Sequence, residues 1–73
     1  MDNSLDIGVI GLGVMGLRML ERLDAHPRLN AVAVWDADAA AVQRALHRYP
    51  RLQAANGAGA LIERAGLHGL YIA

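Results

Sequence analysis

Three glycines, Gly11, Gly13 and Gly16, could hold a phosphate group. They form a G-x-G-x-x-G pattern directly after the apolar run that ends at Ile10, and this pattern between a strand and a helix is typical of dinucleotide-binding turns. Gly11 would allow a sharp turn with positive φ, Gly13 a close approach to a pyrophosphate, and Gly16 a close approach of helix and sheet. The unpaired N–H groups of the first helical turn and the helix dipole would then hold the phosphates without a lysine.

One acid, Asp36, is placed to bind a ribose. It lies twenty residues after Gly16 and ends a second apolar run, from Ala31 to Trp35. An acid at this strand end accepts hydrogen bonds from ribose hydroxyls and repels a 2′-phosphate. The next residues, Ala37 and Asp38, offer no positive charge, so we expect NAD rather than NADP. Asp36 could instead only cap the second helix, and for Asp38 the cap is the expected role.

The position of Gly16 agrees with the helix that it opens. On a helical wheel, apolar residues surround Gly16 and charged residues lie opposite, namely Met19, Leu20 and Leu23 against Arg18, Glu21 and Arg22. Gly16 is therefore predicted to lie in the middle of the buried face. Gly8, by contrast, is expected to be a strand glycine under a close helix, without a ligand role.

Apolar periodicity and the prolines predict the remaining elements. Residues 1–4 read as a loose tail; strands are predicted over 5–10, 31–35, 52–55 and 67–73, and helices over 14–25, 38–48 and 57–65. Pro27 and Pro50 are expected to end the first two helices, because the residue before a proline is pushed out of the helical region. The second strand is apolar throughout, as expected of a parallel strand covered on both faces.

Two helices have predicted buried faces. The second is expected to bury Ala39, Val42, Ala45, Leu46 and Tyr49 and to expose Gln43, Arg44 and His47. The third is expected to bury Leu61 and Ile62 and to expose Glu63 and Arg64, with Gly66 as its C-terminal cap.

The β-α-β-α-β-α-β order predicts an α/β fold, a partial Rossmann-type, doubly wound parallel sheet. Right-handed crossovers give the strand order 3-2-1-4. The switch point then falls between the first and fourth strands, beside the glycine turn. Motif and topology thus point to the same place.

Composition excludes several classes of function. The 73 residues are enough for one small domain. A net charge of zero and the lack of a basic cluster argue against a nucleic-acid partner. No apolar run approaches the roughly 20 residues that span a membrane, and the N-terminus lacks a basic n-region, so a cytoplasmic location is expected. The chain has no cysteine, and its three histidines are 21 residues apart, which makes a metal site improbable.

From about Ile7 to Ala73 the chain resembles the N-terminal domain of the glucose–fructose oxidoreductase / inositol dehydrogenase (Gfo/Idh/MocA) family. The resemblance rests on the segments IGVIGLGVMG, HPRLNAVAVWDAD, RYP and LYIA. It implies an oxidoreductase, usually a homo-oligomer, that transfers hydride between NAD(P) and a sugar, inositol or related polyol. It also implies that the backbone of Ile72 and Ala73 lies along the cofactor.

We therefore expect a cofactor-binding set at the glycine turn and the ends of the second and fourth strands. Its members are Gly11, Leu12, Gly13, Val14, Met15, Gly16, Asp36, Ala37, Ile72 and Ala73. The family's E-K-P motif with its lysine, and its C-terminal substrate domain, are not in these residues, and all seven basic residues are arginines. The chain departs from the family at His68-Gly69, where an acid and a small residue are common. We expect residues 1–73 to be the N-terminal part of a dinucleotide-binding domain, without catalytic or metal-binding residues, and to be marginally stable or associated by itself.

Three other readings stay open. The β-hydroxyacid dehydrogenase family shares the opening I-G-x-I-G-L-G-x-M-G, but its first helix leads to the second strand sooner, and that strand usually ends in Asn-Arg. A nucleotide-sensing module without chemistry would use the same turn. An adenosylmethionine methyltransferase usually has an acid just before the glycines, where this chain has Ile10.

Overall fold

The computed structural model of the chain describes residues 4–64 and 66–73. Strands and helices alternate as predicted. The elements are β1 (Leu5–Ile10), α1 (Val14–Ala25), β2 (Leu29–Trp35), α2 (Ala39–Arg48), β3 (Gln53–Ala54), α3 (Ala58–Ile62) and β4 (Gly69–Ile72). Most of the predicted tail, residues 1–3, and the predicted end of the third helix, residue 65, lie outside the described residues.

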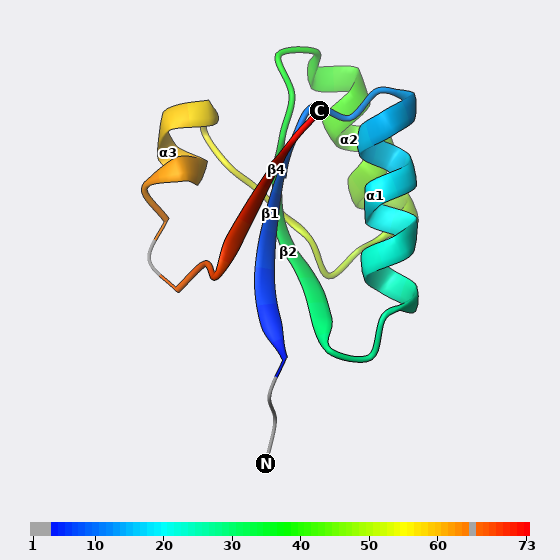
Figure 1. Cartoon of the computed structure of the whole chain (residues 1–73). Coiled ribbons are helices and arrows are strands. Elements are labelled where there is room, and N and C mark those ends of the chain that lie inside the picture. Colours follow the sequence, from blue (N-terminus) through cyan, green and yellow to red (C-terminus); the bar gives the residue numbers. More distant parts are fainter. Residues whose placement is uncertain (1–3, 65) are drawn as a thin grey trace.

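The four strands form one parallel sheet of order β3-β2-β1-β4, which confirms the predicted topology. Figure 1 shows α1 and α2 on one face of this sheet and α3 on the other. Since β1 pairs with both β2 and β4, its carboxyl end lies between theirs. The turn that follows β1 is therefore flanked by both neighbouring strand ends.

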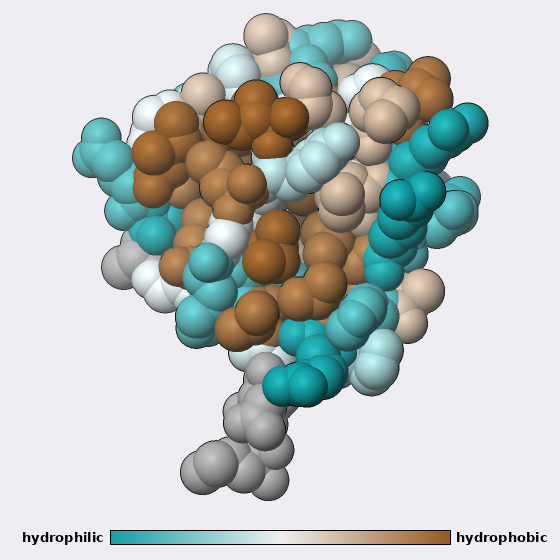
Figure 2. All heavy atoms as spheres, in the orientation of Figure 1, coloured by the Kyte–Doolittle hydropathy of each residue, from teal (hydrophilic) through white to brown (hydrophobic). Residues whose placement is uncertain are grey.

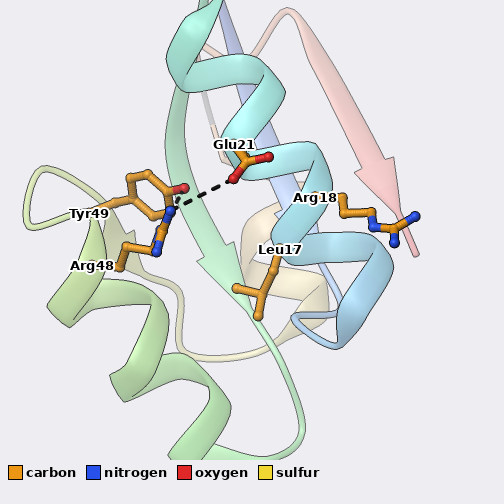
Figure 3. Close-up of a pocket in the computed structure, with 5 residues that line it drawn as sticks. All are labelled: Leu17, Arg18, Glu21, Arg48 and Tyr49. Atoms are coloured by element: carbon orange, nitrogen blue, oxygen red, sulfur yellow. Dashed lines mark hydrogen bonds and ion pairs between the residues drawn. The ribbon is translucent and has the colours of Figure 1, made fainter.

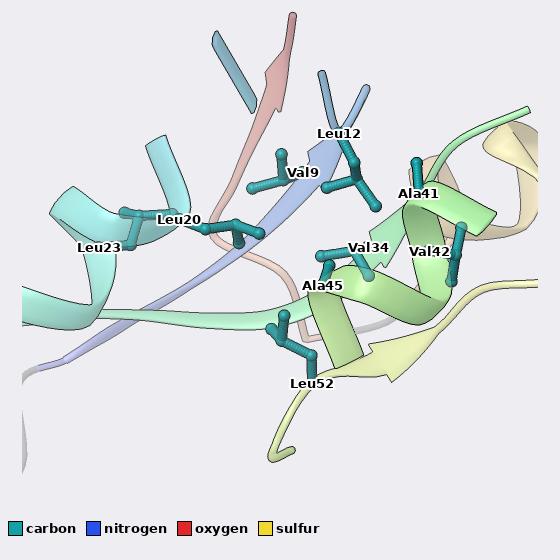
Figure 4. Packing of buried hydrophobic residues seen from close by; sticks show 9 residues of the cluster. All are labelled: Val9, Leu12, Leu20, Leu23, Val34, Ala41, Val42, Ala45 and Leu52. Carbon is teal, nitrogen blue, oxygen red and sulfur yellow. The ribbon is translucent and has the colours of Figure 1, made fainter. Parts of the chain in front are cut away.

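The main core lies between the sheet and the two longer helices. Figure 4 shows side chains of β1 and β2 meeting those of α1 and α2. The buried cluster comprises Val9, Leu12, Leu20, Leu23, Val34, Ala41, Val42, Ala45 and Leu52. Burying large aliphatic side chains in this way stabilises the fold by about 1.5–3 kcal/mol each.

The opposite face of the sheet carries small residues. Gly8 and Ala33 are paired neighbours on β1 and β2 and both are buried. A Cβ at Gly8 would lie 3.1 Å from the side chain of Leu61, which is fully buried in α3. Gly8 is therefore a strand glycine under a close helix, as expected, and Ala33 and Val34 confirm burial on both faces in the middle of β2.

The ends of the first two helices follow their predicted signals. His26, before Pro27, is the extended C-cap of α1, and α2 ends at Arg48, two residues before Pro50. The side chain of Asp38 caps α2 by accepting a hydrogen bond from the Ala40 N–H. Within α2, Ala41 is buried and Ala39 is exposed, so the predicted buried face was wrong at its first turn.

The third helix departs most from prediction. It ends at Ile62, with Glu63 as its C-cap, and Gly66 takes its positive φ outside the helix rather than as its cap. Ile62 is 56% exposed, so the prediction that it is buried was wrong. A five-residue helix presents little more than one turn to the sheet, and in α3 only Leu61 is buried.

Strand lengths differ from prediction because pairing sets them. β2 begins two residues earlier than expected, where Leu29 pairs with Leu5 of β1. β3 is confined to the two residues that pair with Ala33 and Val34. β4 begins only at Gly69, because the imidazole Nδ1 of His68 accepts the Asp6 N–H at 2.9 Å, in place of a backbone carbonyl.

Candidate functional site

The predicted cofactor-binding residues meet at the carboxyl ends of β1, β2 and β4. The Gly11 N–H donates to the Trp35 carbonyl at 2.9 Å, and the Ala73 N–H donates to the Ile10 carbonyl at 2.9 Å. A Cβ at Gly11 would lie 3.1 Å from the Ala73 carbonyl oxygen. The structure thus holds the glycine turn between the ends of the two neighbouring strands (Figure 1).

Each glycine of the motif has a distinct surrounding. Gly11 has φ +94°, which favours glycine. At Gly13 a Cβ would meet nothing within 4 Å, so this position faces open space. At Gly16 a Cβ would collide with the backbone carbonyl of Gly11. The close approach that Gly16 permits is therefore between α1 and the turn itself.

The amino end of α1 is open to an anion. Its N-cap is Gly13, no side chain caps it, and its first turn contains no acidic residue. The Gly13 carbonyl accepts from the Leu17 N–H at 2.9 Å, so the first-turn amides of Val14, Met15 and Gly16 precede the first helical bond. Unpaired N–H groups and the positive end of the helix dipole favour a negatively charged ligand here.

Asp36 binds two backbone amides with its two carboxylate oxygens. Oδ2 accepts from the Leu12 N–H at 2.6 Å, and Oδ1 accepts from the Asp38 N–H at 2.7 Å. The hydrogen bond from the Asp38 N–H lowers the pKa of Asp36 most, followed by the bond from the Leu12 N–H. Partial burial raises this pKa, and the positive charge of Arg44 lowers it. The carboxylate is therefore kept ionised.

Two features of Asp36 were not predicted from the sequence. Its bond to Leu12 joins residues 24 positions apart, and no local pattern indicates it; the adjacency of the β1 and β2 ends in the predicted topology was the available signal. Arg44, expected only as an exposed residue of the second helix, is close enough to lower the pKa of Asp36. Asp36 does not cap α2, since Asp38 does.

The other predicted residues divide into buried and exposed. The side chain of Leu12 is 2% exposed and belongs to the core, while its N–H is engaged by Asp36. Val14, Met15 and Ile72 are 69%, 57% and 65% exposed. Ala37 and Ala73 are also exposed. Three large apolar side chains are therefore exposed near the carboxyl edge of the sheet.

A separate surface hollow of about 230 Å³ lies between α1 and the end of α2 (Figure 3). Arg48 contacts Glu21 there at 3.8 Å and Tyr49 Oη at 3.0 Å. Exposed ion pairs of this kind contribute at most about 1 kcal/mol. The lining residues, Leu17, Arg18, Glu21, Arg48 and Tyr49, do not include the glycine turn, so this hollow is distinct from the candidate site.

Histidines take structural positions near the opposite end of the sheet. His68 binds the Asp6 N–H, and His26 Nδ1 accepts from the Arg28 N–H at 3.1 Å. Within residues 4–64 and 66–73, no three His, Cys, Asp or Glu side chains are grouped so as to hold a metal ion. Nor does any helix in this described part have the length and apolar character to cross a membrane.

One family model matches most of the chain. A family model described as the NAD binding domain of 6-phosphogluconate dehydrogenase matches residues 6–69, which include both the glycines and Asp36. Among curated proteins, none matches the chain significantly.

Several solved structures share the fold. GenD2 from gentamicin A biosynthesis, in complex with NAD, is 22% identical with a TM-score of 0.86, over 97% of this chain and 20% of its own. An oxidoreductase from Desulfitobacterium hafniense, described as NADPH-dependent, is 20% identical with a TM-score of 0.87, over 100% and 21%. KijD10, a 3-ketoreductase from Actinomadura kijaniata in complex with TDP-benzene and NADP, is 27% identical with a TM-score of 0.81, over 96% and 22%. The chain thus spans about a fifth of the length of these proteins, and the likeness confirms a partial Rossmann fold.

Proposed function

The chain belongs to the NAD binding domain family of 6-phosphogluconate dehydrogenase, and we propose that it holds the adenosine and pyrophosphate half of NAD at the turn from Gly11 to Gly16. The observation that carries this proposal is the uncapped amino end of α1 at Gly13, a position where a Cβ would meet nothing within 4 Å. A pyrophosphate there would accept the first-turn N–H groups in place of water.

The adenosine ribose would lie against Asp36. Both carboxylate oxygens already accept a backbone N–H, but each oxygen has a second lone pair for a ribose hydroxyl. The negative charge, maintained by these same bonds, would repel the 2′-phosphate of NADP. The exposed side chains of Val14, Met15 and Ile72 would provide the apolar surface along which the cofactor lies.

The positive charge of Arg44 bears on the choice between NAD and NADP. Its charge acts on Asp36 from α2, so a positive charge does exist near the ribose position. As long as Asp36 is ionised, we expect Arg44 to be partly neutralised by it and NAD to remain preferred. Removing the carboxylate would leave Arg44 available to a 2′-phosphate.

For the whole protein we propose an NAD(P)-dependent oxidoreductase, in which the bound cofactor supplies the hydride chemistry. The motifs that resemble the Gfo/Idh/MocA family support a sugar, inositol or polyol substrate, and KijD10 is a ketoreductase crystallised with a TDP compound. The family model favours a second candidate, a dehydrogenase of the 6-phosphogluconate type, close to the β-hydroxyacid dehydrogenase alternative. Residues 1–73 would bind the cofactor and leave substrate binding and proton transfer to other residues.

The single tryptophan offers a direct test of cofactor binding. The Trp35 carbonyl binds the Gly11 N–H, so this residue lies at the same edge of the sheet as the proposed site, and NADH bound there should quench its emission by energy transfer. Saturable quenching by NADH that adenosylmethionine does not reverse is the expected result. Reversal of the quenching by adenosylmethionine, or no quenching by NADH, would contradict the proposal.

Asp36→Arg tests the choice of cofactor. The variant should weaken NAD by roughly tenfold, about 1.4 kcal/mol, because both the ribose acceptor and the Leu12 bond are lost, and it should shift the preference toward NADP. Asp24→Arg is the matched control, since it makes the same charge change at an exposed position in the last turns of α1. Unchanged NAD and NADP affinities in Asp36→Arg would contradict the ribose role.

A further inference from the structure

We propose that Asp36 is a positioning residue that sets the shape of the glycine turn before any ligand binds, in addition to the ribose contact of the proposed function, on which this inference rests. The acid at the end of β2 would then support pyrophosphate binding through the protein backbone. Ribose recognition alone does not require this second role.

The geometry joins two loops through one carboxylate. Leu12 lies in the turn between β1 and α1, and Asp38 lies in the loop between β2 and α2. Asp36 accepts the N–H of Leu12 with Oδ2 at 2.6 Å and that of Asp38 with Oδ1 at 2.7 Å. Hydrogen bonds from backbone N–H groups to a carboxylate are stronger than neutral ones. The carboxylate therefore ties the two loops together at the carboxyl edge of the sheet.

The arrangement requires a carboxylate rather than an amide. Because the two N–H groups donate to different carboxylate oxygens, an asparagine could accept only one of these hydrogen bonds. Its NH₂ group would face the other N–H donor. One backbone N–H would lose its acceptor. The residue type at position 36 is thus constrained by the ligand-free turn as well as by the ribose.

Leu12 transmits the effect to the phosphate position. Its side chain is buried in the core, and its N–H is held by Asp36, so the residue is fixed at both points. The preceding amide, of Gly11, is bound to the Trp35 carbonyl. The first two amides of the turn therefore serve its structure, and the pyrophosphate is left to the N–H groups from Gly13 onward, whose direction Leu12 fixes.

The test separates the backbone effect from the ribose effect with two probes. ADP carries the ribose hydroxyls, and 2′,3′-dideoxy-ADP lacks them while keeping the diphosphate. Affinities of both are measured by NMR titration of the full chain for wild type, Asp36→Asn and the control Asp38→Asn. The control removes the same charge two residues away, leaves the Asp38 N–H in place, and retains a favoured N-cap residue.

Asp36→Asn is expected to weaken 2′,3′-dideoxy-ADP by roughly two- to tenfold, the equivalent of one hydrogen bond, and ADP by more. Hydrogen exchange of the Leu12 amide should speed up in the ligand-free variant, whereas Asp38→Asn should change neither quantity. An unchanged affinity for 2′,3′-dideoxy-ADP would overturn the positioning role even if ADP binding fell.

One measurement needs no variant and no ligand. In the wild-type chain the Leu12 amide shift should follow the titration of Asp36, and a pH-independent shift would overturn the inference. If wild type bound neither ADP nor NADH, the proposed function would fail, while the exchange and shift of Leu12 would still decide whether Asp36 holds the turn.

Discussion

The two faces of the sheet are built differently. On the face under α1 and α2, β1 and β2 present Val9 and Val34 to a nine-residue buried cluster. On the face under α3, the adjacent pair is Gly8 and Ala33. Large side chains thus meet the two long helices on one face, whereas small residues lie under the short helix on the other.

The difference shows at the surface as well. Figure 2 shows apolar residues gathered over β4 and beside α3, while hydrophilic residues follow α1. Exposed members on this side include Ile62 and Ile72. The glycine turn lies where the closely packed α1 meets the sheet, so the candidate site is built on the better supported of the two faces. The glycine turn thus depends on packing that the α3 face does not provide.

The largest expected difference in stability is between substitutions of two helical glycines, one on each face of the sheet. Gly16→Ala should destabilise the fold by about 4 kcal/mol or more, because its Cβ collides with the Gly11 carbonyl and backbone must move. A Cβ at Gly59 in α3 would meet nothing within 4 Å. Gly59→Ala should therefore stabilise the fold by about 0.5 kcal/mol, because it reduces the conformational entropy of the unfolded chain. Urea unfolding measures both. Similar effects of the two substitutions would contradict the contrast between the helices.

A smaller contrast is expected from two fully buried leucines. Leu20→Ala in α1 should cost about 3–4 kcal/mol, because the surrounding cluster cannot close on the cavity. Leu61→Ala in α3 should cost about 2 kcal/mol, since a five-residue helix can settle onto the small residues beneath it. The unfolding free energies, with Val14→Ala as an exposed control, test this order. A larger loss from Leu61→Ala would reverse our view of which face carries the stability.

The smallest expected effect is the change in unfolding free energy at low pH. Since the folded pKa of Asp36 is lowered from 3.8, its ionisation contributes stability that is complete above that ordinary value and is lost as the pH falls toward the lowered one. The difference in unfolding free energy between wild type and Asp36→Asn should be about 1 kcal/mol at pH 7 and pH 5 alike, and smaller at pH 3. A difference that grew on acidification would contradict the two hydrogen bonds.

Much of the fold was predictable where local chemistry is strong. β1 and α1 occupy the predicted residues, because an apolar run that ends at Ile10, three glycines and Pro27 mark their ends. The prediction was less accurate where such local signals are weak. The third helix has no polar cap or amphipathic run of adequate length, so its extent, and the exposure of Ile62, depend on how much of the sheet it can cover.

At the candidate site the sequence predicted the location but not the connections. The spacing of Gly11, Gly13 and Gly16 indicated the turn and the positive φ of Gly11, which the structure confirms. The close packing at Gly16, expected between helix and sheet, is instead against the Gly11 carbonyl of the turn. The charge of Arg44 acts on Asp36 within one strand–helix unit. The bond from the Leu12 N–H to Asp36 and that from the Asp6 N–H to His68 join residues far apart in the chain. Their formation depends on strand order and register rather than on neighbouring residues.

The sequence by itself thus determined the alternation of elements, the strand order and the place of the glycine turn, because backbone preference and apolar periodicity act over a few residues. Only the tertiary structure decided which groups share that place. Parallel pairing of β1 with β2 and β4 brings the Asp36 carboxylate to the Leu12 amide and Ala73 to Gly11. Hydrogen bonds and steric contacts act over about 3–4 Å, a distance that the folded chain sets and the spacing of residues in the sequence does not.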